Sequence, residues 1–456
     1  MEKRTRRAGD RVRRIVRYTI VVFLACGFGG FFLLARMFRE DAARLPSDIE
    51  LARSRGLPLT FDDLRRLSPK VPESENGAYL FIFAMRELEK LPENLDRNLR
   101  LGRNSTIEDR MWAERAIADF QPTMRILEAA VKRPYFVFET DPPFQNNIQP
   151  KVPWRYNYEL AFQKMLNFIS AGCRSKFRQN DAFGELKDLS TLLSLAEHFP
   201  RYSTPNGSWT IITAEAVVMG QLTRIARRNA SDTAILDRVA ELLARVRLPD
   251  LYKLIQTEFV IGHETILRVT SLREIGVQIY APDPIKKAIE DLYQSPGVKQ
   301  AYEANFIRRY IRIFEKLPQD SEDWPAIHSA IAKMNDELDK DKSIDNVLNR
   351  ALGRADAVGP LVIASYQAEL RILQEAVAAL RQHSTTGKYP MSLPIPGPTA
   401  IDPLWHFPLR YMVQTDGFTI SSTGRDFGKY NPMGMKSGSV FRYTEGREPG
   451  RMSLTY

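Results

Sequence analysis

The chain has 456 residues and a formal net charge of +10, a value that would suit a polyanionic partner such as nucleic acid. Most of this charge is local, because the first seventeen residues contain eight Lys or Arg and only two acids. The other residues carry 57 Lys or Arg against 53 Asp or Glu. That near balance argues against nucleic acid as a partner of the main part of the chain.

An uncharged run of eighteen residues, Tyr18 to Ala35, follows the basic start of the chain. As a helix it would be about 27 Å long, close to the roughly 30 Å hydrocarbon core of a bilayer. We therefore expect a single transmembrane helix over residues 18–38, with the lipid bilayer as a partner. Because basic flanks stay in the cytoplasm, residues 1–17 are predicted to be a cytoplasmic tail of an inner-membrane protein, with the rest extracytoplasmic.

Three processed forms are the alternatives to this anchor. A cleaved signal peptide would have a shorter apolar core and a small-residue cleavage site, whereas Arg36 follows this run. A lipoprotein would have small residues before a lipidated Cys26, where bulky Leu24 stands instead. A pilin-like leader would place Gly directly before the run and Glu a few residues inside it, and neither is there. The sequence favours a retained signal-anchor.

Small residues are spaced four apart within the uncharged run. Ala25 with Gly29, and Cys26 with Gly30, form pairs of the kind that let two membrane helices approach closely. Self-association through this segment is therefore a further hypothesis.

Residues 39–383 are predicted to form a mainly α-helical region of stacked, repeat-like helix pairs. Apolar residues recur three and four positions apart in successive segments, such as 186–196, 211–225 and 236–246. Short polar or Pro- and Gly-containing connections separate these segments, which favours antiparallel neighbours. No fixed period or signature set recurs, so no named repeat family is indicated.

Local signals refine this helical prediction. Ser105 with Glu108 forms a capping box that starts a helix, and Pro122 predicts a break or kink further on. Cys173 falls on an apolar stripe at helical spacing, which favours a buried core residue over a nucleophile.

The interval from 133 to 158 interrupts the helical pattern with seven aromatic and five proline residues. It is predicted not to form a regular helix. Rings and amides on a proline-stiffened loop suit a carbohydrate or peptide ligand. The candidate ligand-binding residues are Tyr135, Phe138, Trp154, Tyr156 and Tyr158. The alternative is a structural loop that covers the helices and buries its rings.

No residue pattern in the sequence identifies a catalytic or metal centre. The five histidines are scattered, and the nearest approach to a metal site is Glu258, His263 and Glu264, which lacks the second His of a metalloprotease helix. No nucleophile elbow, phosphate-binding loop or dinucleotide fingerprint occurs. The sequence therefore predicts no catalytic residue and no cofactor, and favours a protein that is not an enzyme.

The last ninety residues change from helix to turns and strands. After a helical stripe that ends near His383, the chain has the ordered motifs Gly-x-Tyr-Pro, Asp-Pro, Pro-Leu-x-Tyr and Ser-x-Gly-x-Asp. Alternating apolar residues flank an Asp-Gly turn at 416–417 and predict a β-hairpin, with residues 440–443 as a third strand. We expect a small antiparallel β cassette over residues 384–456.

This ordered set, which covers residues 366–426, resembles the C-terminal cassette of the major pseudopilin of type II secretion. It also resembles the end of a group of uncharacterised single-pass bacterial envelope proteins that carry the cassette behind a helical region. The pseudopilin resemblance implies a calcium site in the final loop, with Asp426 at the matching position. Because Lys429, Tyr430 and Asn431 follow where further acids would be expected, the sequence favours a structural loop there.

These features predict a membrane-anchored, extracytoplasmic protein of the bacterial envelope with a structural or interaction role and envelope proteins as partners. One alternative is an extracytoplasmic hydrolase or lyase acting on glycan or peptide, for which Glu159 beside the aromatic interval is the starting point. Another is a component associated with a pseudopilus or with secretion, which the missing leader disfavours.

Overall fold

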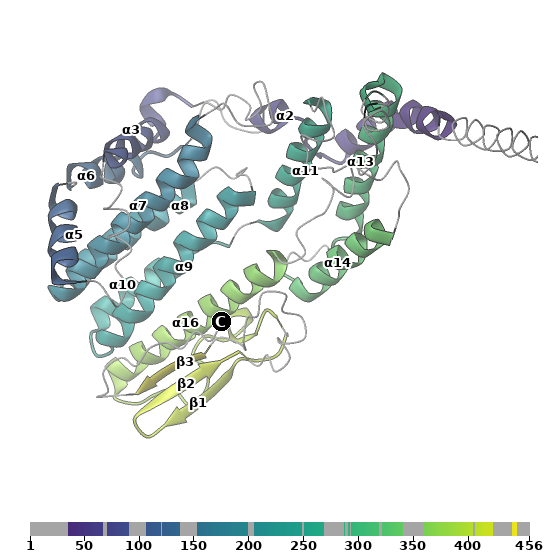
Figure 1. Ribbon diagram of the computed structural model, residues 1–456. Coiled ribbons are helices and arrows are strands. Elements are labelled where there is room, and N and C mark those ends of the chain that lie inside the picture. The colour runs from purple at the N-terminus through teal and green to yellow at the C-terminus, as the bar shows by residue number, and fades with distance from the viewer. Residues whose placement is uncertain are drawn as a thin grey trace, which may run out of the picture. The chain divides into compact units, whose positions relative to one another are not determined.

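The fold comes from a computed structural model (Figure 1). The described residues are 35–66, 71–90, 106–119, 121–136, 153–198, 205–248, 250–268, 287, 291, 293–318, 322–340, 359–404, 406–422 and 440–444. They belong to two compact units. The first unit is drawn from the stretches Met1–Thr60, Phe259–Glu315 and Met334–Arg354, and the second from Phe61–Glu258, Lys316–Lys333 and Ala355–Tyr456.

The described residues are mainly α-helical, as predicted. A helix without a label covers residues 35–54. The labelled helices are α2 (Phe61–Arg66), α3 (Ala78–Glu89), α5 (Ile107–Asp119), α6 (Gln121–Ala130), α7 (Pro153–Arg178), α8 (Ala182–His198), α9 (Pro205–Arg228), α10 (Thr233–Leu243), α11 (Leu251–Arg268), α13 (Pro296–Lys316), α14 (Trp324–Lys340) and α16 (Gly359–Thr386). The strands are β1 (Arg410–Gln414), β2 (Gly417–Ser421) and β3 (Val440–Thr444).

The predicted fold is nevertheless wrong, because it includes a transmembrane helix. In the part of the chain that the structure describes, no helix is long and apolar enough to cross a membrane. Most of the expected span, residues 18–34, lies outside that part. Its last residues belong to the helix 35–54, where Phe38 is only 4% exposed and its ring lies 5.8 Å from the ring of Tyr302 in α13. The apolar residue that extended the predicted span is thus buried against protein.

The helix 35–54 and α13 run in the same direction within the first unit. Asn305 donates a hydrogen bond to Asp41 at 3.1 Å, and Arg55, directly after the helix 35–54, forms an ion pair with Glu315 near the end of α13 at 2.6 Å. Because the residue numbers of both contact partners increase in the same direction, the two helices are parallel. A parallel pair needs a long connection, and here most of the second unit lies between its two members in the sequence.

A shared arginine fixes this helix pair. Arg308 of α13 forms ion pairs with Asp41 and, at 3.1 Å, with Asp48. Burial raises the pKa of Asp48, and the positive charge of Arg308 opposes that rise. The ion pair therefore offsets part of the cost of removing this carboxylate from water.

The second unit is built around α7, α8, α9, α10 and α16, which lie next to one another (Figure 1). The α7–α8 and α8–α9 pairs are in contact, and α10 contacts α8, α9 and α16. The predicted apolar stripes of residues 186–196 and 211–225 fall on α8 and α9, and that of residues 236–246 begins on α10 and ends just after it. Leu189, Val218 and Val239 from these stripes are fully buried, which confirms the predicted helix faces.

Two local predictions are confirmed as well. Helix α5 ends at Asp119 and α6 begins at Gln121, so the chain changes helix beside Pro122, which occupies the first turn where proline is tolerated. Cys173 lies fully buried in α7, and its burial raises the thiol pKa to about 12. A thiol with so high a pKa is protonated at neutral pH and is a poor nucleophile.

The aromatic interval is only partly irregular. Helix α7 begins at Pro153, so the prediction that residues 133–158 lack regular helix is wrong for its last six residues. Proline at a helix start is favourable, because its missing N–H would have no partner within the helix. Residues 137–152 lie outside the described residues.

The predicted β-hairpin is confirmed. Strands β1 and β2 are antiparallel and pair from Arg410 opposite Ser421 to Gln414 opposite Gly417, and β3 adds to the other side of β2. The predicted third strand at 440–443 is therefore present. Strands β2 and β3 contact α16, so the sheet belongs to the second unit.

Polar groups on α16 hold the irregular chain that precedes the hairpin. Arg371 donates to the backbone oxygen of Ile401 at 2.8 Å, and four residues later Glu375 accepts from the backbone N–H of Ile395 at 3.0 Å. Glu375 is fully buried, and this burial raises its pKa. These side chains provide partners for backbone groups that no sheet or helix satisfies.

We predict opposite effects for alanine at two helical glycines. A Cβ at Gly262 in α11 would lie 2.4 Å from Cζ of Phe306, whereas a Cβ at Gly220 in α9 meets no atom within 4 Å. Gly262→Ala should lower the free energy of unfolding by about 1–3 kcal/mol, because a buried ring must move. Gly220→Ala should raise it by up to about 1 kcal/mol through helix propensity. Urea unfolding of both variants measures this, and equal effects would contradict the close contact of α11 and α13.

Candidate functional site

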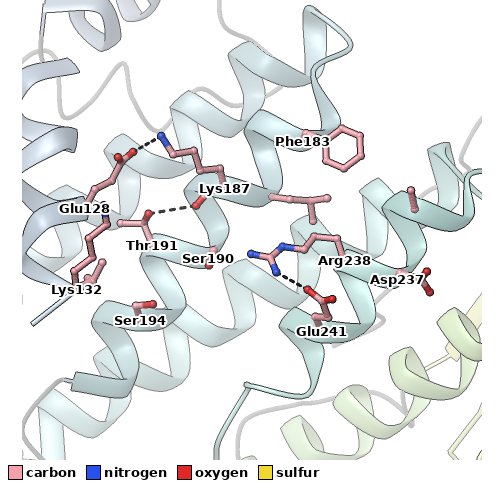
Figure 2. Close-up of a pocket in the computed structure, with 13 residues that line it drawn as sticks. Glu128, Lys132, Phe183, Lys187, Ser190, Thr191, Ser194, Asp237, Arg238 and Glu241 are labelled. Atoms are coloured by element: carbon pink, nitrogen blue, oxygen red, sulfur yellow. Dashed lines mark hydrogen bonds and ion pairs between the residues drawn. The ribbon is translucent and has the colours of Figure 1, made fainter. Parts of the chain in front are cut away.

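The candidate functional site is a groove of about 750 Å³ in the second unit, between α6, α8 and α10 (Figure 2). We call it the α8 groove. Helix α8 supplies its middle, the end of α6 with the following turn lies on one side, and α10 lies on the other.

Helical spacing explains which residues of α8 face the groove. Phe183, Lys187, Ser190, Thr191 and Ser194 follow one another at intervals of one, three or four residues, and so share one helix face. The Phe183 ring is 58% exposed, although most large apolar side chains of this helix are buried. The groove thus combines an exposed ring with a row of polar groups.

The charged side chains around the groove are mostly paired within the protein. Lys187 of α8 contacts Glu128 of α6 at 2.8 Å, and this hydrogen bond raises the pKa of Lys187. On the α10 side Arg238 pairs with Glu241, and both dashed contacts are visible in Figure 2. Lys132, which follows α6, has no such partner among the described residues. One lysine of the lining is therefore available to an acidic ligand group.

Asp237 of α10 also lines the groove and pairs outside it. Its carboxylate lies 2.6 Å from Arg381 of α16. The groove therefore has three basic and three acidic side chains in its lining and no large net charge.

Arg245, just after α10, engages two serines of the α8 face. Its guanidinium donates to Ser190 at 2.9 Å, to Ser194 at 2.7 Å and to both carboxylate oxygens of Glu197 at 3.1–3.2 Å. A serine oxygen that accepts from arginine keeps its own O–H as a donor. Neither hydroxyl donates to an acceptor among the described residues. Ser190 and Ser194 therefore have free donors at the groove.

The opposite face of α8 carries a buried ionic cluster. Glu185 is fully buried, and its two carboxylate oxygens accept from Arg224 at 2.7 Å and Arg228 at 2.8 Å, both on α9. Each guanidinium also lies over the ring of Phe177 in α7, at 4.2 and 4.3 Å from its centre. The cluster ties three helices together and fixes the orientation of α8.

A second ion pair supports the same helix. Lys176 of α7 contacts Asp188 of α8 at 2.6 Å. Burial raises the pKa of Asp188, and the hydrogen bond from Lys176 opposes this rise.

Glu215 of α9 is a buried carboxyl near the end of α10. It is 5% exposed and accepts a hydrogen bond from the backbone N–H of Arg247 at 3.3 Å. Burial is the main cause that raises its pKa to about 8. Glu215 is therefore mostly protonated at neutral pH. It does not line the α8 groove.

Of the residues predicted as a ligand site, the structure describes the side chain of Tyr135 alone. Tyr135 is 40% exposed and pairs through its backbone with Asn76, while the neighbouring Phe136 stacks on His198 at 4.9 Å. Phe136 is half-buried in this arrangement, and the two interpretations of the interval both stay predictions. The first turns of α7 contain Trp154, Tyr156, Tyr158 and Glu159, of which the structure describes the backbone and not the side chains.

The remaining predicted site residues also lie outside the described residues. They are Phe138, Asp426, Tyr18, Ala25, Gly29 and Gly30. Ala35 begins the described helix 35–54. The ligand, calcium and helix-packing roles stay predictions.

His263 has a structural environment. Its Nδ1 lies 2.7 Å from the backbone oxygen of Leu59, and its Nε2 lies 3.0 Å from the carboxylate of Glu303. Because a carbonyl oxygen only accepts, Nδ1 carries a proton. Both ring nitrogens are thus used, and Glu264 pairs instead with Arg268 at 2.9 Å. Among the described residues no group of three or more His, Cys, Asp or Glu is arranged to hold a metal ion.

The α8 groove was not predicted from the sequence. Its lining comes from three segments between Glu128 and Glu241, and their proximity depends on how the helices stack. One signal was available. Phe183 stands outside the apolar stripe of α8 and shares a helix face with Lys187, and that position indicates an exposed ring.

We predict that Glu215 makes the protein less stable as the pH rises. Its pKa is 4.5 in an unfolded chain and about 8 in the fold, so the folded state holds the proton more tightly between these values. The stabilisation is complete below the unfolded value and is lost as the pH approaches the folded one, by up to about 1.4 kcal/mol per pH unit. Glu215→Gln should flatten this decline in urea unfolding between about pH 5 and about pH 8. An unchanged slope in the variant would refute a buried, protonated carboxyl.

Comparisons with protein-family models, with curated proteins and with solved structures find no match to this chain. The resemblance of residues 366–426 to the pseudopilin cassette therefore stays a prediction from the sequence.

Proposed function

We propose that this protein is an interaction protein of the bacterial envelope that binds a short segment of a partner protein in the α8 groove. The observation that carries the proposal is the exposed ring of Phe183 beside hydrogen-bond donors and one lysine that have no partner among the described residues. The partner segment that would fit this groove has an apolar or aromatic side chain next to an acidic residue.

The apolar part of this recognition rests on Phe183. A ring that is 58% exposed loses contact with water when a partner covers it, and aromatic anchors of this kind dominate many interfaces. Leu186 is buried and also lines the groove, so the lining contains a second apolar side chain.

The polar part selects an acidic group over a basic one. Lys132 offers an ammonium that is unpaired among the described residues, and Ser190 and Ser194 offer hydroxyl donors, so a carboxylate or carbonyl oxygen finds partners on the α6 side and in the middle of the groove. The acids of the lining are already paired with Lys187, Arg238 and Arg381. A basic ligand group would have to displace one of these pairs.

The low net charge of the lining argues against a polyanion as the ligand. Strong attraction of nucleic acid or acidic polymers needs many unpaired basic side chains, and the lining has one that lacks a partner in the part of the chain that the structure describes. Specificity through an anchor ring and a few donors is the usual pattern of peptide-segment recognition.

The location of the protein stays a prediction. It rests on the basic residues 1–17 and the uncharged run that follows them. A reporter enzyme fused after Tyr456 tests it, because activity restricted to the cytoplasm would contradict an extracytoplasmic main part.

We predict that peptides selected by the full-length protein from a random displayed library share an aromatic or leucine residue close to Asp or Glu. Phe183→Ser should weaken their binding by about tenfold or more, because the anchor contact is lost. Lys132→Glu should weaken acidic peptides similarly through charge repulsion. Fluorescence anisotropy with labelled peptides measures both.

The matched control is Phe83→Ser, which removes an equally exposed ring (52%) from α3 outside the groove. Circular dichroism checks that each variant is folded. The proposal fails if no peptide is enriched, or if the control weakens binding as much as the groove variants do.

A further inference from the structure

Among the described residues, strand β1 is an edge of the sheet with free backbone groups. The sheet order is β1-β2-β3, so β1 pairs with β2 on one side only (Figure 1). Gln414 and Gly417 close the two-residue hairpin loop as a hydrogen-bonded pair, and such pairs alternate along an antiparallel ladder. The N–H and C=O groups of Tyr411 and Val413 therefore point away from β2.

The bonding of the preceding residue agrees with this assignment. Leu409 lies two residues before Tyr411, so its backbone groups point to the same side of the strand. Its N–H donates on that side to the backbone oxygen of Ala400 at 2.8 Å. Beyond that point the outward groups of Tyr411 and Val413 have no hydrogen-bond partner among the described residues. The free edge is thus confined to the five residues of β1.

The side chains of β1 are not the charged residues or prolines that usually prevent an edge strand from pairing with another chain. Met412 is 56% exposed and Val413 is 39% exposed. The strand has no proline and no acidic residue, and its only charge is Arg410 at one end. An exposed strand edge of this composition is a template for pairing with another strand.

We propose that β1 pairs antiparallel with β1 of a second copy of this chain. With Met412 opposite Met412 of the copy, Tyr411 lies opposite Val413, and the outward groups of both residues meet as hydrogen-bonded pairs. The two copies thereby use all their free edge groups in four hydrogen bonds. Two three-stranded sheets become one sheet of six strands.

The sequence of the strand is complementary to itself in this register. Arg410 lies opposite Gln414 of the copy and diagonal to its Asp416, so no like charges face each other. Tyr411 opposite Val413 is an aromatic and β-branched pair, which is a favourable cross-strand combination. If the register shifted by one residue, the free N–H and C=O groups of one copy would face residues whose backbone groups already bond to β2. The hydrogen bonds between the copies would then be lost.

A cysteine cross-link tests the register in the full-length chain with Cys26→Ser as background. In the proposed pairing the Cα atoms at 412 lie about 4.5 Å apart, within the range of about 4.4–6.8 Å that a disulfide spans. Met412→Cys should form a covalent dimer on mild oxidation. Gln414→Cys should stay monomeric alone and cross-link only when mixed with Arg410→Cys.

Proline at Val413 tests the backbone bonds. Val413→Pro removes an outward N–H that the sheet itself does not use, so the fold tolerates it better than proline inside the ladder. It should abolish the Met412→Cys dimer, whereas Val413→Thr keeps the N–H and should retain it. Equal cross-linking at 412 and 414, dimers that survive Val413→Pro, or monomers alone for Met412→Cys would each overturn the proposal.

Discussion

The buried carboxylate of Glu185 is the constraint on which the second unit depends. A carboxylate removed from water is costly unless it is fully paired, and here Arg224 and Arg228 meet both of its oxygens at 2.7 and 2.8 Å. Losing one partner of such a pair costs about 3–5 kcal/mol, so the relative positions of α8 and α9 are strongly fixed. Phe177 beneath both guanidinium groups extends this constraint to α7.

The contacts that fix one face of α8 also set the direction in which the side chains of its other face point. Phe183 and Lys187 lie two residues either side of Glu185, and therefore on the opposite side of the helix. When Glu185 faces α9, these side chains must face α6 and α10 or the solvent. The exposed ring is thus held by an ionic cluster behind it, which gives a binding surface little freedom to reorganise.

The sequence predicts most helices because their signals are local. Apolar spacing placed Leu189 and Val239 in the core, Pro122 marked a helix change, and the Asp-Gly turn at 416–417 indicated the hairpin. The groove could not be predicted, because Lys132 approaches α8 only through the stacking of whole helices.

Tertiary contacts also explain the incorrect predictions. Phe38 looked like part of an apolar membrane run, yet its partner Tyr302 is hundreds of residues away and is invisible to local hydropathy. The proline-rich interval before α7 suggested irregular chain throughout, although Pro153 suits a helix start. The ionic cluster of Glu185 was not among the predictions, because its partners on α9 are distant in sequence.

Photo-cross-linking in cells tests the central claim most directly. A photoreactive phenylalanine analogue placed at position 183 reports what covers the α8 groove, and the same analogue at position 83 on α3 is the control. We expect one discrete adduct from position 183, attached beside an acidic residue of the partner and lost with Lys132→Glu. The same adducts from both positions, or none from position 183, would contradict it.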